Sequence, residues 1–367
     1  MYHLKFLIPA LLLMLTECCA SPEENLISIL KTASKECTPL FGHQDDLMYG
    51  HTWNVTKEAD HLMERSDVLF TAGAYPYVLG LDLGGLEIDS PVNLDGNDFK
   101  LMREAAIKHY ERGGIVTLSW HLRNPLTGGD SWDVSSDRVV GSILPGGERH
   151  EYFMGWLERI ATYISSLKDS RGRQIPVIFR PWHEHSGGWF WWGTGLCSAA
   201  QFNALWTMTY DYMVEEKKVE GLVWAISPNS LSGNFENWEE RYPGDEYVDI
   251  VGLDCYCPTY RPQPEAFEAF RRDFADCLGS LQRFAEKHGK ILAVTETGYE
   301  GLTYEKWWTE VLSPAIDGIP VSYLLVWRNT DEMPRGMTHF YAPWPGGPSE
   351  HDFKEYVNSG KIKLLEK

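Results

Sequence analysis

The sequence predicts an α/β protein, a (β/α)8 TIM barrel in a single domain. Three observations support this fold. Short β-branched, apolar segments alternate with amphipathic helical segments along the chain. The apolar segments are nearly continuous, as in parallel strands covered on both faces. Polar and aromatic residues follow each of these segments, and such barrels carry their functional groups at the carboxyl ends of the strands.

We expect eight strands, each a short run dominated by apolar residues. A ring of parallel strands needs a helix between successive strands, and the segments between these runs are long enough to supply one. The expected strands are Pro39–Gly42, Val68–Ala72, Ile115–Trp120, Val177–Arg180, Leu222–Ala225, Ile250–Leu253, Ile291–Thr295 and Tyr323–Trp327.

Several of the intervening helices are visible in the sequence. Apolar residues recur at helical spacing within 153–167 and again within 267–284, where they predict core-facing stripes. Ser198-Ala-Ala-Gln201 is a capping box that predicts a helix start. Gly113 and Gly289 stand where helices are expected to end in a left-handed conformation.

Residues 1–20 have the features of an export signal rather than of a folded domain. Lys5 supplies a positive charge, Phe6–Leu15 is apolar but too short to span a bilayer, and Ala20 is a small residue suited to cleavage. No linker, charge block or internal repeat divides residues 21–367. We therefore expect one barrel domain there, exported to the periplasm or the cell exterior.

A second interpretation of the N-terminal segment is a lipoprotein signal. Leu15-Thr-Glu-Cys18 resembles a bacterial lipobox that would place a lipid on Cys18, although Glu17 is a poor residue before such a cysteine. The protein would then be anchored to a membrane by lipid. No other segment has enough consecutive apolar residues for a membrane span.

Charge and cysteine content exclude several classes of function. The net charge is −19, which argues against nucleic acid or anionic lipid as a partner and is neutral toward an uncharged polysaccharide. The spacing of Cys255 and Cys257 matches no zinc pattern, and an odd number of cysteines follows residue 20, so we expect no disulfide framework. We expect a monomer. The cysteines concerned are Cys37, Cys197, Cys255, Cys257 and Cys277.

The segment Ile178–Gly193 combines charged and aromatic residues directly after an apolar strand. It contains Arg180, Glu184 and two histidines among several tryptophan and phenylalanine rings. Such residues are costly to bury without a function, although a single histidine there could be an ordinary core residue. Flat rings beside a carboxylate suit a sugar, whose C–H face packs on a ring while its hydroxyls bind polar groups.

A second glutamate, Glu296, follows the seventh expected strand. Glycoside hydrolysis needs two carboxyl groups across the scissile bond, and strands four and seven face each other across a barrel. A separation near ~5–5.5 Å would give the retaining geometry. Arg180 and Tyr256 are candidates to stabilise Glu296 as a carboxylate. Burial against Trp189 and a nearby second carboxylate would raise the pKa of Glu184.

These residues carry a resemblance to glycoside hydrolase family 26, the β-mannanase family of barrel glycosidases. A histidine directly before the acid/base is characteristic of that family, and His183 has this position. The matching segments spread over nearly all of residues 21–367 in the family's order. They are Gly42-His-Gln-Asp-Asp46, Trp120-His121, Arg180-Pro-Trp-His-Glu184, Gly188-Trp-Phe-Trp-Trp-Gly193, Gly252-Leu-Asp-Cys-Tyr256, Thr295-Glu-Thr-Gly298 and Trp327-Arg328.

The resemblance implies a retaining hydrolase of β-1,4-mannan, with Glu184 as acid/base and Glu296 as nucleophile, and with no metal or organic cofactor. It also implies supporting roles for seven residues. His121 and Trp327 would line the subsite of the reacting sugar, His183 would orient nucleophile and substrate, Tyr256 would hydrogen-bond Glu296, Trp189 would lie by the leaving group, and Arg180 and Arg328 would support these groups from behind.

Three alternatives stay open at this point. The His183-Glu184-His185 triplet invites a zinc site, but a zinc protease spaces its ligands as H-E-x-x-H on a helix. Another β-linked backbone, xylan or mixed-linkage glucan, is the nearest rival substrate. A non-catalytic glycan-binding protein is the rival from another class, although such a protein has no need of two proton-poised glutamates.

Two long segments are expected to shape access to the site. Leu122–Arg149 and Tyr75–Asn97 are rich in Gly, Pro and Asp and lack strong periodicity. Long loops on the catalytic rim of a barrel usually build subsites or lids. We expect them to close one end of the groove and to favour release of short products, such as a disaccharide, from chain ends. The alternative is that they lie away from the groove.

Overall fold

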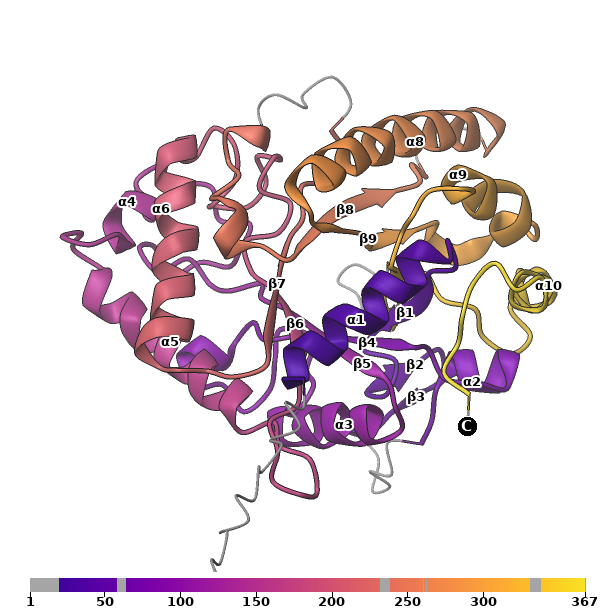
Figure 1. Cartoon of the computed structure of the whole chain (residues 1–367), viewed down its shortest axis with the longest axis horizontal. Helices are drawn as coiled ribbons and strands as arrows, with labels where there is room; N and C mark the ends of the chain where they lie inside the picture. The colour runs from indigo at the N-terminus through magenta and orange to yellow at the C-terminus, as the bar shows by residue number, and fades with distance from the viewer. Residues whose placement is uncertain are drawn as a thin grey trace, which may run out of the picture.

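The computed structural model describes residues 20–57, 64–231, 238–259, 261, 263–330 and 338–366 (Figure 1). The expected export signal therefore lies outside the described residues, except for Ala20. Within the described ranges, no helix combines the length and the apolar character needed to cross a membrane.

Eight parallel strands close into a barrel, so the predicted (β/α)8 fold is confirmed. Their order around the barrel is β1-β10-β9-β8-β7-β6-β5-β4, which is sequential in the chain once the short outlying strands are set aside. The strands are β1 (Leu40–Gln44), β4 (Val78–Asp82), β5 (Ile115–Ser119), β6 (Val177–Arg180), β7 (Leu222–Ile226), β8 (Ile250–Tyr256), β9 (Ile291–Gly298) and β10 (Tyr323–Val326).

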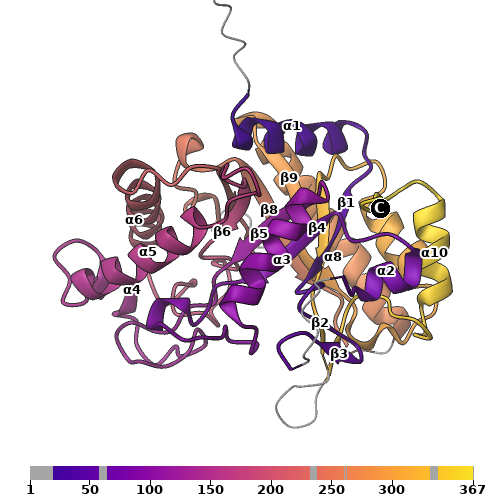
Figure 2. The same cartoon turned by 90° about the horizontal axis from the view of Figure 1, so that it is seen from below.

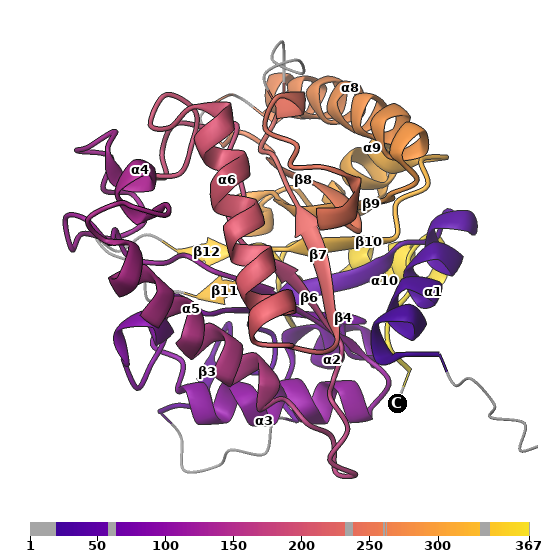
Figure 3. The same cartoon turned by 60° about the vertical axis from the view of Figure 1, so that its left-hand side comes forward.

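Helices surround this barrel as an outer layer (Figures 1 and 3). The α-helices are α1 (Pro22–Lys35), α2 (Asp67–Ala72), α3 (Phe99–Glu111), α4 (Val139–Ile143), α5 (His150–Ser165), α6 (Ala199–Tyr210), α8 (Gln263–His288), α9 (Ser313–Ile316) and α10 (Glu350–Asn358). Shorter helical turns are η1 (Leu86–Ile88), η2 (Asp211–Glu216), η3 (Asp245–Tyr247), η4 (Glu300–Leu302) and η5 (Trp307–Leu312). Two small hairpins pair β2 (Tyr49–Gly50) with β3 (Trp53–Asn54) and β11 (Asn329–Thr330) with β12 (His339–Phe340).

The prediction of the second strand is wrong. Val68–Ala72 lies in the helix α2, where the Ser66 side chain caps the first turn and Gly73 ends the helix with a φ of 79°. A short apolar run is compatible with either structure, so the caps decide. The second barrel strand is instead β4, inside the segment 75–97 that was expected as a loop. Gly80 in β4 leaves room for Gln44, since a Cβ there would lie 2.1 Å from Gln44 Oε1.

The helix α1, which the sequence analysis did not predict, closes the amino-terminal end of the barrel. Its side chains Leu26, Leu30 and Ala33 are buried in one cluster with interior residues of the barrel strands. The helix lies at one end of the barrel and the β2–β3 hairpin lies at the opposite end (Figure 2). Because α1 fills the amino-terminal end, the carboxyl ends of the strands are left to form a site.

Other local predictions agree with the structure. The capping box of Ser198 and Gln201 begins α6, with both reciprocal hydrogen bonds present. The stripe within 267–284 lies on α8 and is largely buried. Among the described residues all five cysteines are free thiols, so the expectation that they form no disulfide framework is confirmed. Cys37 is exposed and the other four are buried.

Candidate active site

The carboxyl ends of the barrel strands bring the predicted polar residues to one rim. Arg180 ends β6, and Glu184 follows it by a short turn. Glu296 lies within β9, opposite Asp254 in the neighbouring strand β8. The strand register shifts between Leu253 and Asp254, and such an irregularity re-aims the side chains that follow it. The two expected glutamates are therefore carried by separate, rigidly placed elements.

Glu184 is held in a tight turn that departs from ordinary backbone geometry. Trp182 and Glu184 both have a positive φ, 55° and 52°, which is uncommon for residues other than glycine. The Glu184 amide donates to the Ser227 carbonyl oxygen at 2.7 Å, which fixes the turn against β7. Trp189 donates its Nε1–H to Glu184 Oε2 at 2.6 Å. One carboxyl oxygen of Glu184 is thus occupied, and the other is left to carry a proton.

Glu296 is buried, and it receives hydrogen bonds on both carboxyl oxygens. Arg180 Nη2 pairs with Oε1, and the Tyr256 hydroxyl donates to Oε2 at 2.7 Å. Both contacts were predicted, and both are confirmed. Donors of this kind stabilise the ionised form of a carboxyl group. The arrangement orients Glu296 inside the barrel and places a donor on each of its carboxyl oxygens.

Arg180 is held in turn by a second buried carboxyl group. Its Nη1 donates to Asp254 Oδ2 at 2.9 Å and to Ser227 Oγ at 3.1 Å. Thr295 donates to Asp254 Oδ1 at 2.5 Å. Burial raises the pKa of Asp254 to about 7, although the charge of Arg180 opposes this increase. Asp254 therefore positions the guanidinium that binds Glu296.

The environments of the two glutamates are opposite in character. The pKa of Glu184 is raised well above its usual range by burial first and then by the negative charges of Glu296 and Asp254. Trp189 and Arg180 oppose this shift but do not overcome it. Glu296 in contrast has a cationic partner and a hydroxyl donor in direct contact. One carboxyl group is therefore suited to hold a proton and the other to act as a base or nucleophile.

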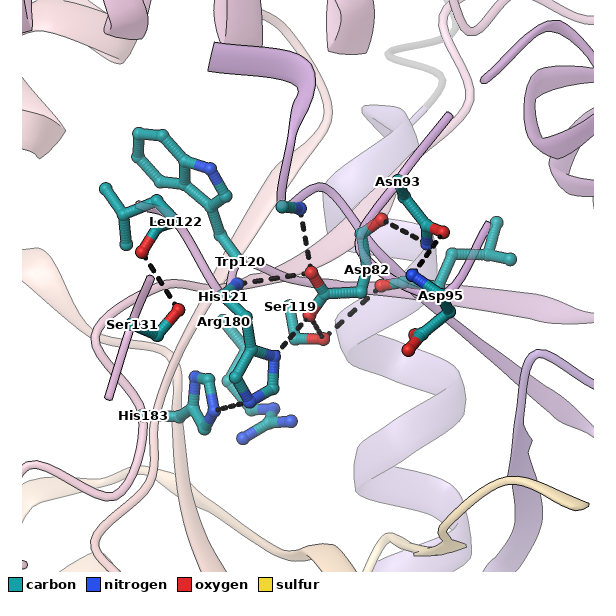
Figure 4. A network of polar contacts seen from close by, with 12 residues as sticks. Asp82, Asn93, Asp95, Ser119, Trp120, His121, Leu122, Ser131, Arg180 and His183 are labelled. Carbon is teal, nitrogen blue, oxygen red and sulfur yellow. Dashed lines mark hydrogen bonds and ion pairs between the residues drawn. The ribbon is translucent and has the colours of Figure 1, made fainter. Parts of the chain in front are cut away.

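Two histidines and an aspartate form a hydrogen-bonded chain at this rim (Figure 4). His183 Nε2 lies 3.0 Å from His121 Nε2, and His121 Nδ1 lies 2.7 Å from Asp82 Oδ2. His183 and His121 were predicted site residues, and the structure places them together. Asp82 was missed because β4, which it ends, was expected as a loop. The apolar run Val-Leu-Gly-Leu before Asp82 is the signal that could have identified it.

Aromatic rings surround this histidine pair and form the wall of the site. His121 stacks on Trp132 with ring centroids 5.5 Å apart and meets Trp327 edge-on at 6.0 Å. Trp132 and Trp189 are 48% and 41% exposed, so their faces are open to a ligand. Trp132 was not predicted as a site residue. Because it lies in the segment 122–149, that segment reaches the site, although α4 interrupts it and it is not wholly a loop.

The segment after β4 reaches the rim from the other side. Asp95 forms an ion pair with Arg328, which follows β10. Asn93 donates to the Asp82 carbonyl oxygen at 3.1 Å, which fixes the same segment to the end of its strand. Arg328 thus connects the end of β10 to the rim segment that carries Asp95. Both long segments thus contact residues at the rim, through Trp132 and through Asp95.

The two histidines beside Glu184 do not face one another. His183 contacts His121, whereas His185 is buried and stacks on Phe202 with ring centroids 4.5 Å apart. Burial lowers the pKa of His185 to about 3, so its ring is neutral. In the described parts of the chain, no three His, Cys, Asp or Glu side chains are grouped as metal ligands.

A (β/α)8 barrel that carries two glutamates in contrasting surroundings at the carboxyl ends of its strands is typical of a barrel glycosidase. The family model for glycosyl hydrolase family 26 matches residues 30–300. The chain belongs to glycosyl hydrolase family 26.

Solved structures of this family are similar to the chain over most of its length. A family 26 β-mannanase from Bacteroides ovatus is 43% identical, with a TM-score of 0.86 over 94% of this chain and 96% of that one. The catalytic domain of an endo-β-1,4-mannanase from Bacillus sp. JAMB-750 is 31% identical, with a TM-score of 0.83 over 95% of this chain and 92% of that one.

A curated relative is considerably longer. A mannan endo-1,4-β-mannosidase from Bifidobacterium adolescentis is 31% identical over 340 residues, which cover 88% of this chain and 33% of that protein. The chain thus spans about a third of the length of this relative.

Proposed function

We propose that the protein is a retaining glycoside hydrolase that cleaves β-1,4-mannosidic linkages in mannan, glucomannan or galactomannan. The observation that carries the proposal is the contrast between Glu184, whose pKa is raised, and Glu296, which is bound by Arg180 and Tyr256. The names of the similar mannanases support mannan as the backbone. No metal or organic cofactor is required by this chemistry.

In the first step, protonated Glu184 gives its proton to the leaving oxygen while Glu296 attacks the anomeric carbon. The bond between the anomeric carbon and the leaving oxygen breaks, and a glycosyl-enzyme forms on Glu296. The hydrogen bond from Trp189 holds Glu184 in one orientation during this transfer. Trp189 is also exposed enough to contact the sugar on the leaving-group side.

In the second step, Glu184 acts as a base and activates water against the glycosyl-enzyme. The change of role follows from the electrostatics, because the charge of Glu296 is one cause of the raised pKa of Glu184. Esterification of Glu296 removes that charge, so the pKa of Glu184 falls and the carboxylate form becomes accessible. The water oxygen bonds to the anomeric carbon, the ester bond to Glu296 breaks and returns its electron pair to that carboxylate, and Glu184 takes the water proton, which restores the starting state.

Contacts around the pair support further roles. Trp327 directly follows β10 and lies beside His121, where its ring can serve as the floor of the reacting-sugar subsite. His121 and His183 would orient the sugar and the nucleophile. We propose that the rim segments carrying Trp132 and Asp95 close one end of the groove and favour short products, including mannobiose, from chain ends.

The location and the assembly of the protein are further parts of this proposal. We propose that residues 1–20 direct export to the periplasm or the cell exterior, either with cleavage before Ser21 or with a lipid on Cys18. We propose that residues 21–367 act as a single monomeric catalytic domain. An uncharged polysaccharide is a suitable substrate for a chain of net charge −19.

A side-by-side assay of reducing-sugar release tests this function. Mannan, glucomannan, galactomannan, xylan and mixed-linkage β-glucan are compared at equal mass, with the Glu296→Ala variant as the inactive control. The proposal expects release from the mannans only. Preferential release from xylan or β-glucan would make another backbone the substrate. Tight binding to mannan without release would favour a glycan-binding protein.

A further inference from the structure

Asp82 is a buried carboxyl group with an unusually complete set of hydrogen-bond donors. Its Oδ1 accepts from the amides of Gly84 at 2.7 Å and His121 at 3.2 Å. Its Oδ2 accepts from Ser119 Oγ and from His121 Nδ1, each at 2.7 Å. Each oxygen thus has two donors, and the carboxylate form is favoured. Burial would raise the pKa of Asp82, but the hydrogen bonds from His121, Ser119 and Gly84 act to lower it.

This carboxylate determines where His121 carries a proton. An ionised carboxyl group can only accept, so His121 Nδ1 must be the donor. In a neutral imidazole the other nitrogen is then an acceptor. The atom 3.0 Å from His121 Nε2 is His183 Nε2, which must therefore donate. One carboxylate thereby fixes the direction of the whole chain shown in Figure 4.

We propose that Asp82 is a positioning residue, which holds the proton on His121 Nδ1 and so makes His183 the donor to His121. The proposal rests on the proposed function, in which His121 and His183 lie beside the reacting sugar and Glu184. A neutral His121 paired with ionised Asp82 adds a negative charge near the anomeric carbon. Such a charge stabilises the positive charge that develops there in the transition state.

His183 directly precedes Glu184 in the chain, so a displacement of one backbone affects the other. His183 is 1% exposed, and its carbonyl oxygen accepts a hydrogen bond from Trp192 Nε1 at 2.8 Å. The next residue is Glu184, in its left-handed conformation. An incorrect proton arrangement at His121 would turn or displace the His183 ring and so disturb the backbone that presents the acid/base.

Several charged groups also act on this chain. Burial lowers the pKa of His183 well below its usual range, and the nearby charge of Arg180 acts in the same direction, so its ring is neutral. Arg328 and Asp45 interact electrostatically with Asp82 from the adjoining strand ends β10 and β1. The ring of His121 also contacts the uncharged rings of Trp132, Phe190 and Trp327.

The Asp82→Asn substitution can reverse the proton arrangement without removing a contact. The amide oxygen of asparagine can accept from the Gly84 and His121 amides, and its NH2 group can donate toward Ser119 Oγ and His121 Nδ1. Ser119 can then turn its hydroxyl to the Leu81 carbonyl oxygen, 3.4 Å away. His121 would carry its proton on Nε2, and His183 would have to accept it. The change is therefore in tautomer rather than in packing.

Kinetics on the substrate that the wild type hydrolyses give the first test. We expect Asp82→Asn to lower kcat by roughly 100-fold or more with little change in KM, as wrong-tautomer substitutions do elsewhere. Its melting temperature should stay near that of the wild type. Ser119→Ala is the matched control, since it removes one neutral donor from Asp82 but keeps the bond to His121. We expect less than about a tenfold effect on kcat for this control.

Nitrogen-15 NMR of the histidine rings gives a second test that needs no activity. The protein has 12 histidines, and the His121→Gln variant assigns the signals of interest. In the wild type near neutral pH, we expect His121 to carry a proton on Nδ1 and none on Nε2. In Asp82→Asn we expect the opposite tautomer.

A wild-type His121 that is protonated on Nε2, or on both nitrogens, overturns the proposal even if the Asp82→Asn variant does not fold. Near-wild-type kcat in a folded Asp82→Asn variant with the reversed tautomer overturns the functional half. The proposed function fails separately, when the wild type hydrolyses none of the β-glycans. In that event the NMR measurement still decides the proton arrangement.

Discussion

Glu184 and Glu296 are the same kind of side chain, yet their neighbours prepare them for opposite roles. Burial and nearby negative charges raise the pKa of Glu184, whereas Glu296 contacts a guanidinium and a phenolic hydroxyl. A protonated group and an ionised group are thus available at the same pH. The asymmetry arises from residues on β6, β8 and β9, so it depends on the barrel being assembled.

The raised pKa of Glu184 gives a testable pH dependence. Activity requires the protonated form, so kcat/KM should fall as the pH rises through this raised pKa. On the acid side, protonation of Glu296 removes the nucleophile, and the profile should be bell-shaped with its maximum on the acid side of neutral. The measurement is kcat/KM against pH on mannan. A flat profile into strongly alkaline pH would contradict an essential protonated carboxyl.

A substrate whose leaving group needs no protonation tests which limb of the pH profile belongs to Glu184. With an aryl glycoside whose leaving group departs without protonation, the alkaline limb of kcat/KM should weaken while the acid limb persists. If both limbs persist equally, Glu184 is not the proton donor for the first step.

Substitution of Trp327 can distinguish a role in sugar binding from a role in core packing. It is partly exposed beside His121, so Trp327→Ala should lower kcat/KM strongly with little loss of stability. Trp308 is 0% exposed and serves as the control, since Trp308→Ala should cost about 3–5 kcal/mol of stability. Thermal unfolding is measured beside kinetics for both variants. A large fall in melting temperature of Trp327→Ala with normal turnover would make this ring a core residue.

At the scale of single residues, sequence reasoning identified the two glutamates and the donors to Glu296. It missed Asp82 and Trp132 for different reasons. Asp82 was missed because the strand that it ends, β4, was predicted to be part of a loop. Trp132 lies in an irregular segment whose path depends on tertiary contacts, such as the hydrogen bond from Ser131 to the Leu122 carbonyl oxygen. No periodic pattern marks such a residue.

Among the elements, β4 and α1 show where sequence patterns were insufficient. The run 68–72 is apolar enough for a strand, but its flanking cap residues make it a helix. The run 78–82 contains a glycine and ends in aspartate, which weakens its strand signal. Helix α1 has a clear capping box at Ser21 and Glu24, and it follows the expected export signal directly. Its position at the barrel end depends on long-range packing.

The role of α1 is testable with two adjacent residues. Leu30 is 0% exposed in the barrel cluster, and Leu30→Ala should lower the free energy of unfolding by about 2–5 kcal/mol. Ile29 is 40% exposed on the same helix, and Ile29→Ala should change it by less than about 1 kcal/mol. Denaturant unfolding measures both. Because α1 lies at the end opposite the glutamates, kcat below the melting temperature should be unchanged. Equal destabilisation by both variants would contradict this packing.

For the whole molecule, the barrel was predictable because its signal repeats. Eight strands and their helices each supply weak evidence for the barrel, so one wrongly assigned strand does not change the predicted fold. The carboxyl-end rule then brought residues far apart in sequence to one rim. The detailed shape of the groove was not predictable, since it depends on the two irregular rim segments and their contacts with His121 and Arg328.

The proposed closure of one end of the groove leads to a prediction about products. If the segments 75–97 and 122–149 block one end, early digestion of unsubstituted mannan should accumulate one short oligosaccharide while viscosity stays high. Chromatography of early products beside viscometry measures this, and Trp132→Ala tests the segment 122–149 directly. A broad ladder of products with a rapid fall in viscosity would show an open groove instead.

In the proposed mechanism Glu296 becomes covalently glycosylated. Glu184 donates a proton to the leaving oxygen in the first step and takes a proton from water in the second. The most direct measurement is mass spectrometry of Glu184→Ala mixed with an activated aryl β-mannobioside. Without its base, this variant should accumulate a mannobiosyl adduct on the peptide that contains Glu296, and azide should release it as a β-linked glycosyl azide. An adduct on another residue, or turnover at the wild-type rate with no adduct, would contradict the account.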